Sequence, residues 1–203
     1  MIQKTNVNAV ARTAVRHIQA GFTLIELLFV IAVIGILAAL ATPFVRELLI
    51  EGRLEPTAKD IINITNTMRA SAAASGSPTP YTDLGAAANA TATFANAGRG
   101  KATNLTIAGA GAAATAQHQL GATNSEVTVA VAANPVNGDS FTITLPTANK
   151  AACPGLSTQL NRIAVAMSIN GTVVKPLGGN YNGSTAENAC TGGDTNTYVL
   201  TFR

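Results

Sequence analysis

The sequence predicts an α+β protein in which one long N-terminal helix packs on an antiparallel β-sheet. The first observation is an uncharged apolar run from Leu27 to Val45, about the length that crosses a bilayer as a helix. The second is alternation of apolar and polar residues from Val127 onward, typical of strands with one buried face. The third is the pair Cys153 and Cys190, which bounds a segment near the C-terminus.

The charge balance of the chain comes from its first residues. There are 13 basic and 10 acidic residues, but Lys4, Arg12 and Arg16 precede Gly21 and no acid does. Removing those three cations leaves a neutral chain that is poor in aromatic residues, so we expect no nucleic-acid partner. By the positive-inside rule the N-terminus is cytoplasmic and everything after Val45 is exported.

One carboxylate stands in the apolar stretch. Glu26 is the only charge between Phe22 and Val45. An acid in the middle of a membrane costs about 3 kcal/mol, so an acid kept there usually has a partner or a task. Nothing else in the run can pair with it, so we expect a partner from another molecule. Gly35 and Pro43 interrupt the run, and proline removes a helix hydrogen bond, so we expect helix breaks at both.

Gly21 followed by Phe22-Thr23-Leu24-Ile25-Glu26 and a long apolar helix resembles the prepilin processing site of type IV pilins. The resemblance implies that residues 1–21 are a leader cleaved by a prepilin peptidase, with methylation of the new Phe22 amine. It implies that Glu26 faces the terminal amine of a neighbouring subunit. It also places a loosening of the helix on assembly between Gly35 and Pro43, where a static kink is the alternative.

A different export signal has to be weighed against this one. Ala39-Leu40-Ala41 resembles the cleavage site of an ordinary signal peptide. The apolar run is longer than the usual signal-peptide core, and Glu26 has no role in that reading. We therefore favour processing at Gly21.

Residues 22–45 are expected to form the transmembrane or filament-core half of the helix, and residues 46–76 its amphipathic half. Apolar or small side chains recur there at steps of three and four: Leu54, Ala58, Ile61, Thr65, Met68 and Ala72. This stripe would pack on a globular domain, with Arg53, Lys59 and Asp60 facing out.

Residues 77–125 are rich in Ala, Gly, Thr and Asn and are expected to form a loop region between helix and sheet. We expect one short strand in it, at Asn104–Ile107. Gly109–Ala114 loosely matches a dinucleotide fingerprint, but the strand, helix and acidic residue that such a site needs are missing from the pattern, so it is read as loop.

Residues 126–203 are expected to form the antiparallel sheet. A hairpin is predicted first, because alternating apolar residues flank the turn chemistry of residues 134–139. The predicted elements are strands at Val127–Val131, Phe141–Leu145, Thr172–Lys175 and Thr197–Phe202, a short helix at Pro154–Met167, and a loop at Gly178–Ser184.

Both cysteines fall in the exported part, where pairs usually form disulfides; two free buried thiols are the alternative. Closing a loop of this length contributes about 4 kcal/mol in the chain-entropy model. The segment 153–190 resembles the D-region of type IV pilins, closest to type IVb and conjugative thin-pilus pilins. Phe22 as the first mature residue is instead typical of type IVa pilins.

The chain shows no pattern that predicts catalysis, a cofactor or a metal. His17 lies in the leader, and His118 is read as alone in a loop. Asp83, Asp139 and Asp194 are read as solvated turn residues, and a calcium site at Asp194 is not favoured.

We therefore expect no enzyme but a structural subunit, the major pilin of a type IV pilus in a Gram-negative cell. Its partners would be copies of itself, the prepilin peptidase and N-methyltransferase, the inner-membrane assembly machinery, and lipid before assembly. The prepilin would lie in the inner membrane and the filament on the cell surface, where it could serve adhesion. The alternatives are a minor pilin or type II secretion pseudopilin, and a membrane-anchored binding domain that never polymerises.

Overall fold

A computed structural model describes residues 21–121, 125–133 and 136–203. The predicted leader, apart from Gly21, and the predicted turn residues Asn134 and Pro135 lie outside the described residues. The chain divides into two compact units, Met1–Thr42 and Pro43–Arg203, and each is treated by itself. The described elements are α1 (Leu24–Ala73), η1 (Thr82–Leu84), α2 (Ala87–Gly98), β1 (Thr106–Ala108), η2 (Gly111–Ala113), β2 (Thr115–Gln117), β3 (Glu126–Ala133), β4 (Asn137–Ala148), η3 (Lys150–Ala152), α3 (Cys153–Leu160), β5 (Ala166–Ile169), β6 (Thr172–Lys175), α4 (Gly183–Ala189) and β7 (Asn196–Phe202).

Helix α1 is continuous through the two residues where breaks were expected. Gly35 and Pro43 both lie inside it, so the single chain has no helix break at either position. A proline removes one main-chain hydrogen bond, whereas the Ala and Leu residues around it favour helix strongly. The hydroxyl of Thr42 donates a hydrogen bond to the carbonyl of Ala38, 2.8 Å away, which does not replace the bond that Pro43 cannot make. Loosening of this stretch on assembly stays a prediction.

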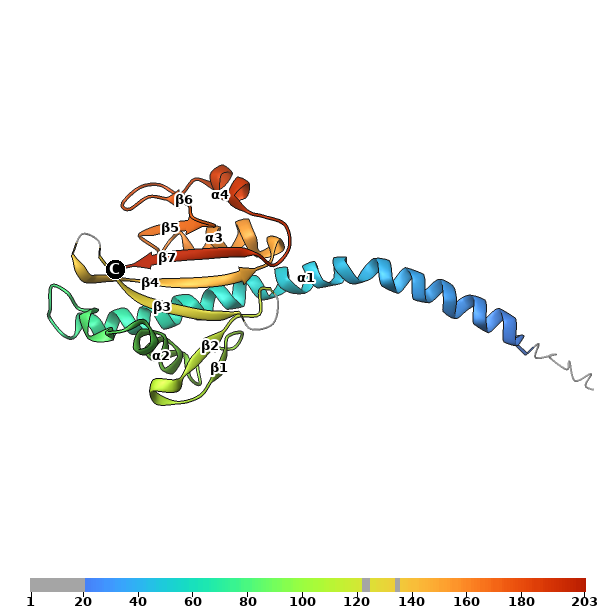
Figure 1. Cartoon of the computed structure of the whole chain (residues 1–203), viewed down its shortest axis with the longest axis horizontal. Helices are drawn as coiled ribbons and strands as arrows, with labels where there is room; N and C mark the ends of the chain where they lie inside the picture. Colours follow the sequence, from blue (N-terminus) through green and yellow to red (C-terminus); the bar gives the residue numbers. More distant parts are fainter. Residues whose placement is uncertain (1–20, 122–124, 134–135) are drawn as a thin grey trace, which may run out of the picture. The chain divides into compact units, whose positions relative to one another are not determined.

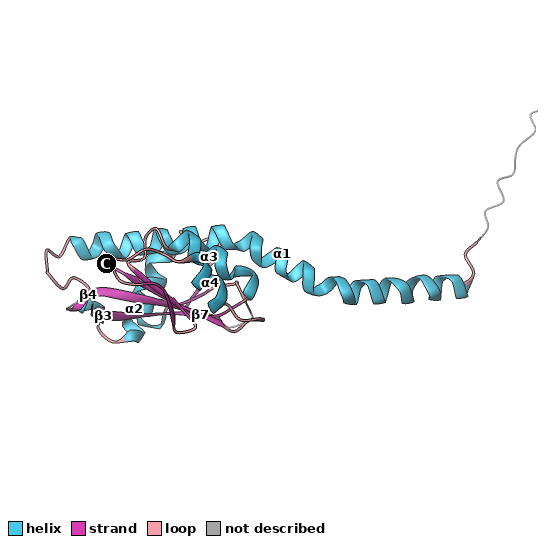
Figure 2. Ribbon diagram, turned by 90° about the horizontal axis from the view of Figure 1, so that it is seen from above, coloured by secondary structure: helices cyan, strands magenta, loops and turns pink. Residues whose placement is uncertain are grey.

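In the second unit, α1 runs along one face of the sheet (Figure 2). The predicted stripe is confirmed, because its members are buried together with further side chains: Ile50, Leu54, Thr57, Ala58, Asp60, Ile61, Ile64, Thr65, Met68 and Ala72. Arg53 and Lys59 are exposed as expected. The α+β class with a long helix on an antiparallel sheet is thus confirmed.

Asp60 is the exception, since it was expected to face solvent and is only 4 % exposed. Its Oδ2 accepts hydrogen bonds from the backbone N–H groups of Thr103, Asn104 and Leu105, at 2.8, 2.7 and 3.2 Å. A buried carboxylate is tolerated where several donors satisfy it. Asp60 therefore holds the chain that leads into β1 against α1.

The sheet contains seven strands in the order β1-β2-β3-β4-β7-β5-β6, all antiparallel to their neighbours (Figure 1). The predicted hairpin is confirmed as β3 and β4, with Val131 opposite Phe141. The predicted last strand is confirmed as β7, which lies between β4 and β5. Phe202 of β7 stacks on Phe141 at 5.5 Å between ring centroids, in the core.

The loop region holds more structure than the sequence predicted. Its short strand forms at Thr106–Ala108 rather than Asn104–Ile107, and it pairs with β2, which was not predicted. The larger error is helix α2, read as loop because it has few large apolar residues. Alanine has the highest helix propensity, and small residues allow close approach. At Gly98 an added Cβ would lie 2.6 Å from the Cδ1 atom of Ile64 on α1.

Two boundaries in the C-terminal part were also wrong. The predicted helix ends at Leu160, and Met167 belongs to strand β5 instead. The chain after the helix is held by Lys175, whose Nζ donates to the carbonyls of Asn161 and Ala164 at 2.5 and 2.8 Å. The predicted loop Gly178–Ser184 runs into helix α4, which the Asn182 side chain caps by accepting from the Thr185 N–H at 3.0 Å.

Candidate assembly site

The predicted processing junction lies just ahead of helix α1. Gly21 and Phe22 are exposed and have no regular secondary structure. Thr23 caps the helix, since its hydroxyl accepts the N–H of Glu26 at 3.3 Å. Thr23 and Glu26 have the spacing of a capping box, in which a Glu or Gln at the third helical position supports the cap. Sequence reasoning missed this cap, although the Thr-x-x-Glu pattern predicts it.

An apolar surface without protein cover follows the junction. Every residue from Gly21 to Leu49 is exposed, including Phe22 at 78 % and Phe44 at 71 %. The helix is long and apolar enough to cross a membrane. Glu26 has no salt bridge to any described residue. Such a surface needs lipid or other helices around it.

The two cysteines are brought together as predicted. Cys153 and Cys190 form a disulfide with a Cα–Cα distance of 6.0 Å, so the free-thiol alternative is wrong. Cys153 opens α3 and Cys190 follows α4, so the bond joins the ends of two short helices. The segment between them also contains β5 and β6.

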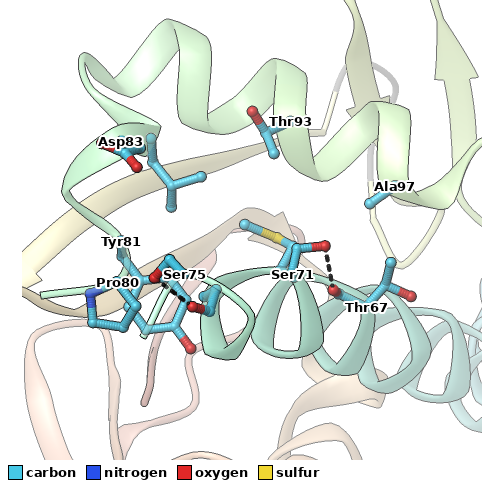
Figure 3. A pocket seen from close by; sticks show the side chains of 11 residues that line it. Thr67, Ser71, Ser75, Pro80, Tyr81, Asp83, Thr93 and Ala97 are labelled. Atoms are coloured by element: carbon cyan, nitrogen blue, oxygen red, sulfur yellow. Dashed lines mark hydrogen bonds between the residues drawn. The ribbon is translucent and has the colours of Figure 1, made fainter. Parts of the chain in front are cut away.

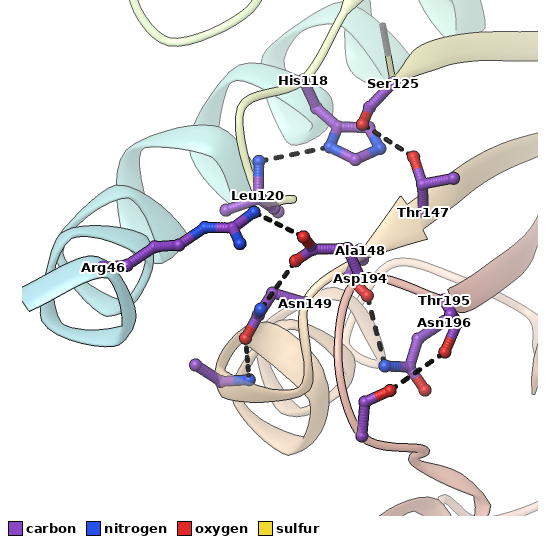
Figure 4. A network of polar contacts seen from close by, with 12 residues as sticks. Arg46, His118, Leu120, Ser125, Thr147, Ala148, Asn149, Asp194, Thr195 and Asn196 are labelled. Carbon is purple, nitrogen blue, oxygen red and sulfur yellow. Dashed lines mark hydrogen bonds and ion pairs between the residues drawn. The ribbon is translucent and has the colours of Figure 1, made fainter. Parts of the chain in front are cut away.

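Asp194 is not a solvated turn residue. Its carboxylate forms an ion pair with Arg46, the first charged residue after the apolar run, and is 16 % exposed (Figure 4). Asn149 donates to its other oxygen at 2.6 Å. The amide oxygen of Asn149 in turn accepts the N–H of Ala151 at 2.8 Å. The turn before β7 is thereby joined to α1 and to the end of β4.

Asp139 was likewise expected to be solvated and is buried, whereas Asp83 is exposed as expected. The Asp139 carboxylate accepts the N–H of Val136 at 3.3 Å and pairs with Arg203 at 3.3 Å. It therefore ties the β3–β4 turn to the residue after β7, a long-range contact that no local pattern reveals.

His118 lies in a segment without regular structure after β2, but it is 3 % exposed rather than free in a loop. Its Nε2 lies 2.8 Å from the carbonyl of Pro146, and its Nδ1 accepts the N–H of Leu120 at 3.3 Å. Burial lowers the pKa of His118 to about 4. Within the described ranges no group of three or more His, Cys, Asp or Glu side chains could hold a metal ion.

Two family models match the chain. The prokaryotic N-terminal methylation motif matches residues 16–42, and the PilS N terminal family matches residues 120–203. No curated protein sequence matches it.

Two similar solved structures are pilins. The type IV b pilin from Salmonella typhi has 23 % identity and a TM-score of 0.49, with coverage of 70 % of this chain and 96 % of that one. TcpA, a type IV pilin from Vibrio cholerae El Tor biotype, has 16 % identity and a TM-score of 0.39, covering 72 % and 98 %.

The methylation motif, the exposed apolar helix and the disulfide-braced sheet define a type IV pilin-like protein. Strands β3 to β7 and the disulfide-bounded segment lie in the part that is similar to the PilS N terminal family. Proteins of this class are structural subunits, and an N-methylation motif implies processing by a prepilin peptidase.

Proposed function

We propose that this chain is a structural subunit, the major pilin, of a type IV pilus. The observation that carries the proposal is the exposed apolar helix from Leu24 to Val45, which begins at a methylation motif and holds a single carboxylate. A membrane anchor needs the apolar surface but not the acid, which costs about 3 kcal/mol in a bilayer. A bundle of such helices can bury the apolar surface and also pair the carboxylate with a charge from a neighbouring helix.

The proposed order of events starts at the junction. Prepilin peptidase cleaves after Gly21 in the inner membrane, and the new Phe22 amine is methylated. The cleaved amine carries a positive charge at the start of the helix. In a bundle of such helices, the amine of one subunit reaches Glu26 of a neighbour. Removing one partner of a desolvated pair costs about 3–5 kcal/mol, so the pair controls which subunits enter the filament.

The subunit acts by polymerising rather than by catalysis. Its partners are copies of itself, the processing enzyme and the inner-membrane assembly machinery, and the finished filament lies on the cell surface. The uninterrupted helix between Gly35 and Pro43 is the proposed place of loosening on assembly. Hydrogen exchange of this stretch, faster in filaments than in the detergent-solubilised subunit, would test it.

Glu26→Gln gives the sharpest test, because glutamine keeps the capping-box geometry and removes only the charge. Filament yield should fall at least tenfold, while cleavage and methylation continue and processed subunit collects in the inner membrane. Glu26→Asp should be intermediate, since the charge remains with a shorter reach.

Thr23→Ala is the matched control. It removes the hydroxyl that accepts the Glu26 N–H, at a cost of about 1 kcal/mol to the helix end, and leaves the carboxylate in place. Near-normal filament yield is expected. Normal filaments from Glu26→Gln, with loss only in Thr23→Ala, would assign Glu26 to helix capping and overturn the charge-pair mechanism.

A further inference from the structure

An exposed apolar patch beside strand β6 has no explanation within one subunit. Beyond Leu49, only three of the described large hydrophobic side chains are exposed: Val136, Val173 and Leu177. Val173 and Leu177, 59 % and 51 % exposed, line the same hollow next to β5 and β7. Apolar side chains gathered on a surface mark interaction sites more often than single ones do.

The patch is also held in a fixed position. Leu177 lies in a turn closed by the Gly179 N–H, which donates to the Pro176 carbonyl at 2.9 Å. Gly178 has φ +68, as the third residue of a type II turn requires. The Gly178 N–H also reaches the carbonyl of Val165 at 3.4 Å. A leucine held outward on a fixed turn is organised in advance to enter a recess.

A recess of suitable character lies between α1 and α2 (Figure 3). It has a volume of about 300 Å³, and Met68, Leu84 and Ala97 are among its lining residues. Two hydroxyl groups on its α1 wall are already used: Thr67 and Ser71 donate to helix carbonyls at 3.0 and 3.1 Å. These hydroxyl groups therefore need no polar ligand, and the recess is suited to an apolar side chain.

The two surfaces lie toward opposite ends of the sheet. β6 is one edge strand, whereas α2 contacts β3, β2 and β1 at the other end. Contact between such unlike surfaces is heterologous, so it does not close on itself and can continue from copy to copy. Lys175 is the charged residue lining the β6 hollow, and Asp83 is the one lining the α1–α2 recess. The opposite signs favour their approach.

We propose that Leu177 of one subunit enters the α1–α2 recess of the next, with Val173 packing at its rim. The occupant of the recess is thus a second copy of this chain. The inference rests on the proposed filament function and adds a contact between globular domains to the contact between helices.

Photo-crosslinking within assembled filaments tests the contact. Leu177 is replaced by benzoylphenylalanine in the full-length chain, and Val136, equally exposed but away from the hollow, is replaced in a matched control. Irradiation should join subunits from position 177, with the crosslinked peptides falling within residues 67–97 of the partner. The position 136 probe should give no such crosslink between subunits. Crosslinks within one subunit are set aside, because the Gly138 carbonyl accepts the Tyr81 N–H and position 136 is therefore near those peptides of its own chain. Filaments with crosslinks elsewhere, or with none, overturn the proposal and leave the filament function standing.

If the bulky probe itself prevents filament formation, charged substitutions test the same contact. Leu177→Asp should lower filament yield at least tenfold with processed subunit unchanged, and Val136→Asp should not. Adding Asp83→Lys to Leu177→Asp should restore part of the yield, because the new carboxylate then meets a cation. Normal filaments from Leu177→Asp, or no restoration in the double variant, overturn the contact. If the wild-type chain forms no filaments, the proposed function fails first.

Discussion

Replacing His118 by glutamine should remove an acid sensitivity that the structure builds into the globular domain. The imidazole is 3 % exposed, and both nitrogens have partners. A neutral ring satisfies both, with Nε2–H donating to the Pro146 carbonyl and Nδ1 accepting from Leu120. A second proton would oppose the Leu120 N–H and place a charge in the interior. The pKa of His118 is accordingly lowered from 6.5 to about 4 by burial.

The sign and size of the effect follow from this pKa. In the unfolded chain the ring takes up its proton near pH 6.5, whereas in the folded protein it does so near pH 4. The stability contributed by the neutral ring is therefore complete above about pH 6.5 and is lost as the pH falls toward 4. Each tenfold change in the dissociation constant corresponds to about 1.4 kcal/mol, so the limiting loss is about 3 kcal/mol. At about pH 4.5 it should be about 2.5 kcal/mol.

The assay is urea unfolding of the full-length subunit in detergent micelles, followed by circular dichroism between about pH 7.5 and 4.5. Wild type and His118→Gln share their carboxylates, so the difference between their free energies of unfolding isolates the histidine. As the pH falls from about 7.5 to 4.5, the wild type should lose about 2.5 kcal/mol more of its free energy of unfolding than the variant does. Parallel stability curves for the two proteins would refute the reasoning, because they would mean that the ring binds protons equally well in both states.

Three further predictions concern stability and processing. Asp60→Asn should lower the free energy of unfolding by about 2–3 kcal/mol, measured by urea denaturation, because an uncharged amide oxygen accepts the three backbone N–H groups more weakly than the carboxylate oxygen does. Cys153→Ser should cost about 4 kcal/mol and lower the amount of exported subunit, whereas free alkylation of both thiols in native protein would contradict the disulfide. Intact mass spectrometry of the exported chain should show a start at methylated Phe22, and a start at Thr42 would instead indicate ordinary signal-peptide cleavage.

The parts of the fold that the sequence predicted well are those where burial imposes a regular period. Phe141, Ile143 and Leu145 alternate along β4 and are all fully buried, so the core face of that strand could be read directly. The α1 stripe is equally regular, at steps of three and four. In both cases the pattern arises because one side of the element faces a continuous core.

Helix α2 escaped prediction because its buried side chains are small. Ala90, Ala95 and Gly98 share its buried face with only one large side chain, Phe94. A search for periodic large apolar residues does not detect such a face, although alanine favours the helix itself. The close approach of Gly98 to Ile64 shows what the small residues provide, namely contact between two helices at short range.

The buried polar residues could not be placed from sequence for a different reason. Asp60 bonds residues more than 40 positions away, and Asp194 is 148 positions from Arg46. A charged residue beside a turn is normally solvated, so the local pattern gives the same expectation for a free and a buried carboxylate. Only the folded topology decides which of them meets a donor.

The Arg46–Asp194 pair gives the turn between the disulfide-bounded segment and β7 a role in holding the domain together. The segment ends at Cys190, and Asp194 lies in the turn that leads into β7. Because β7 is inserted between β4 and β5, both neighbours fix it, and Asn149 orients the carboxylate ahead of it. An ion pair with a half-exposed arginine contributes about 1 kcal/mol or less by itself. Its consequence is positional, since it fastens the last strand to the first charged turn of α1 in the folded domain.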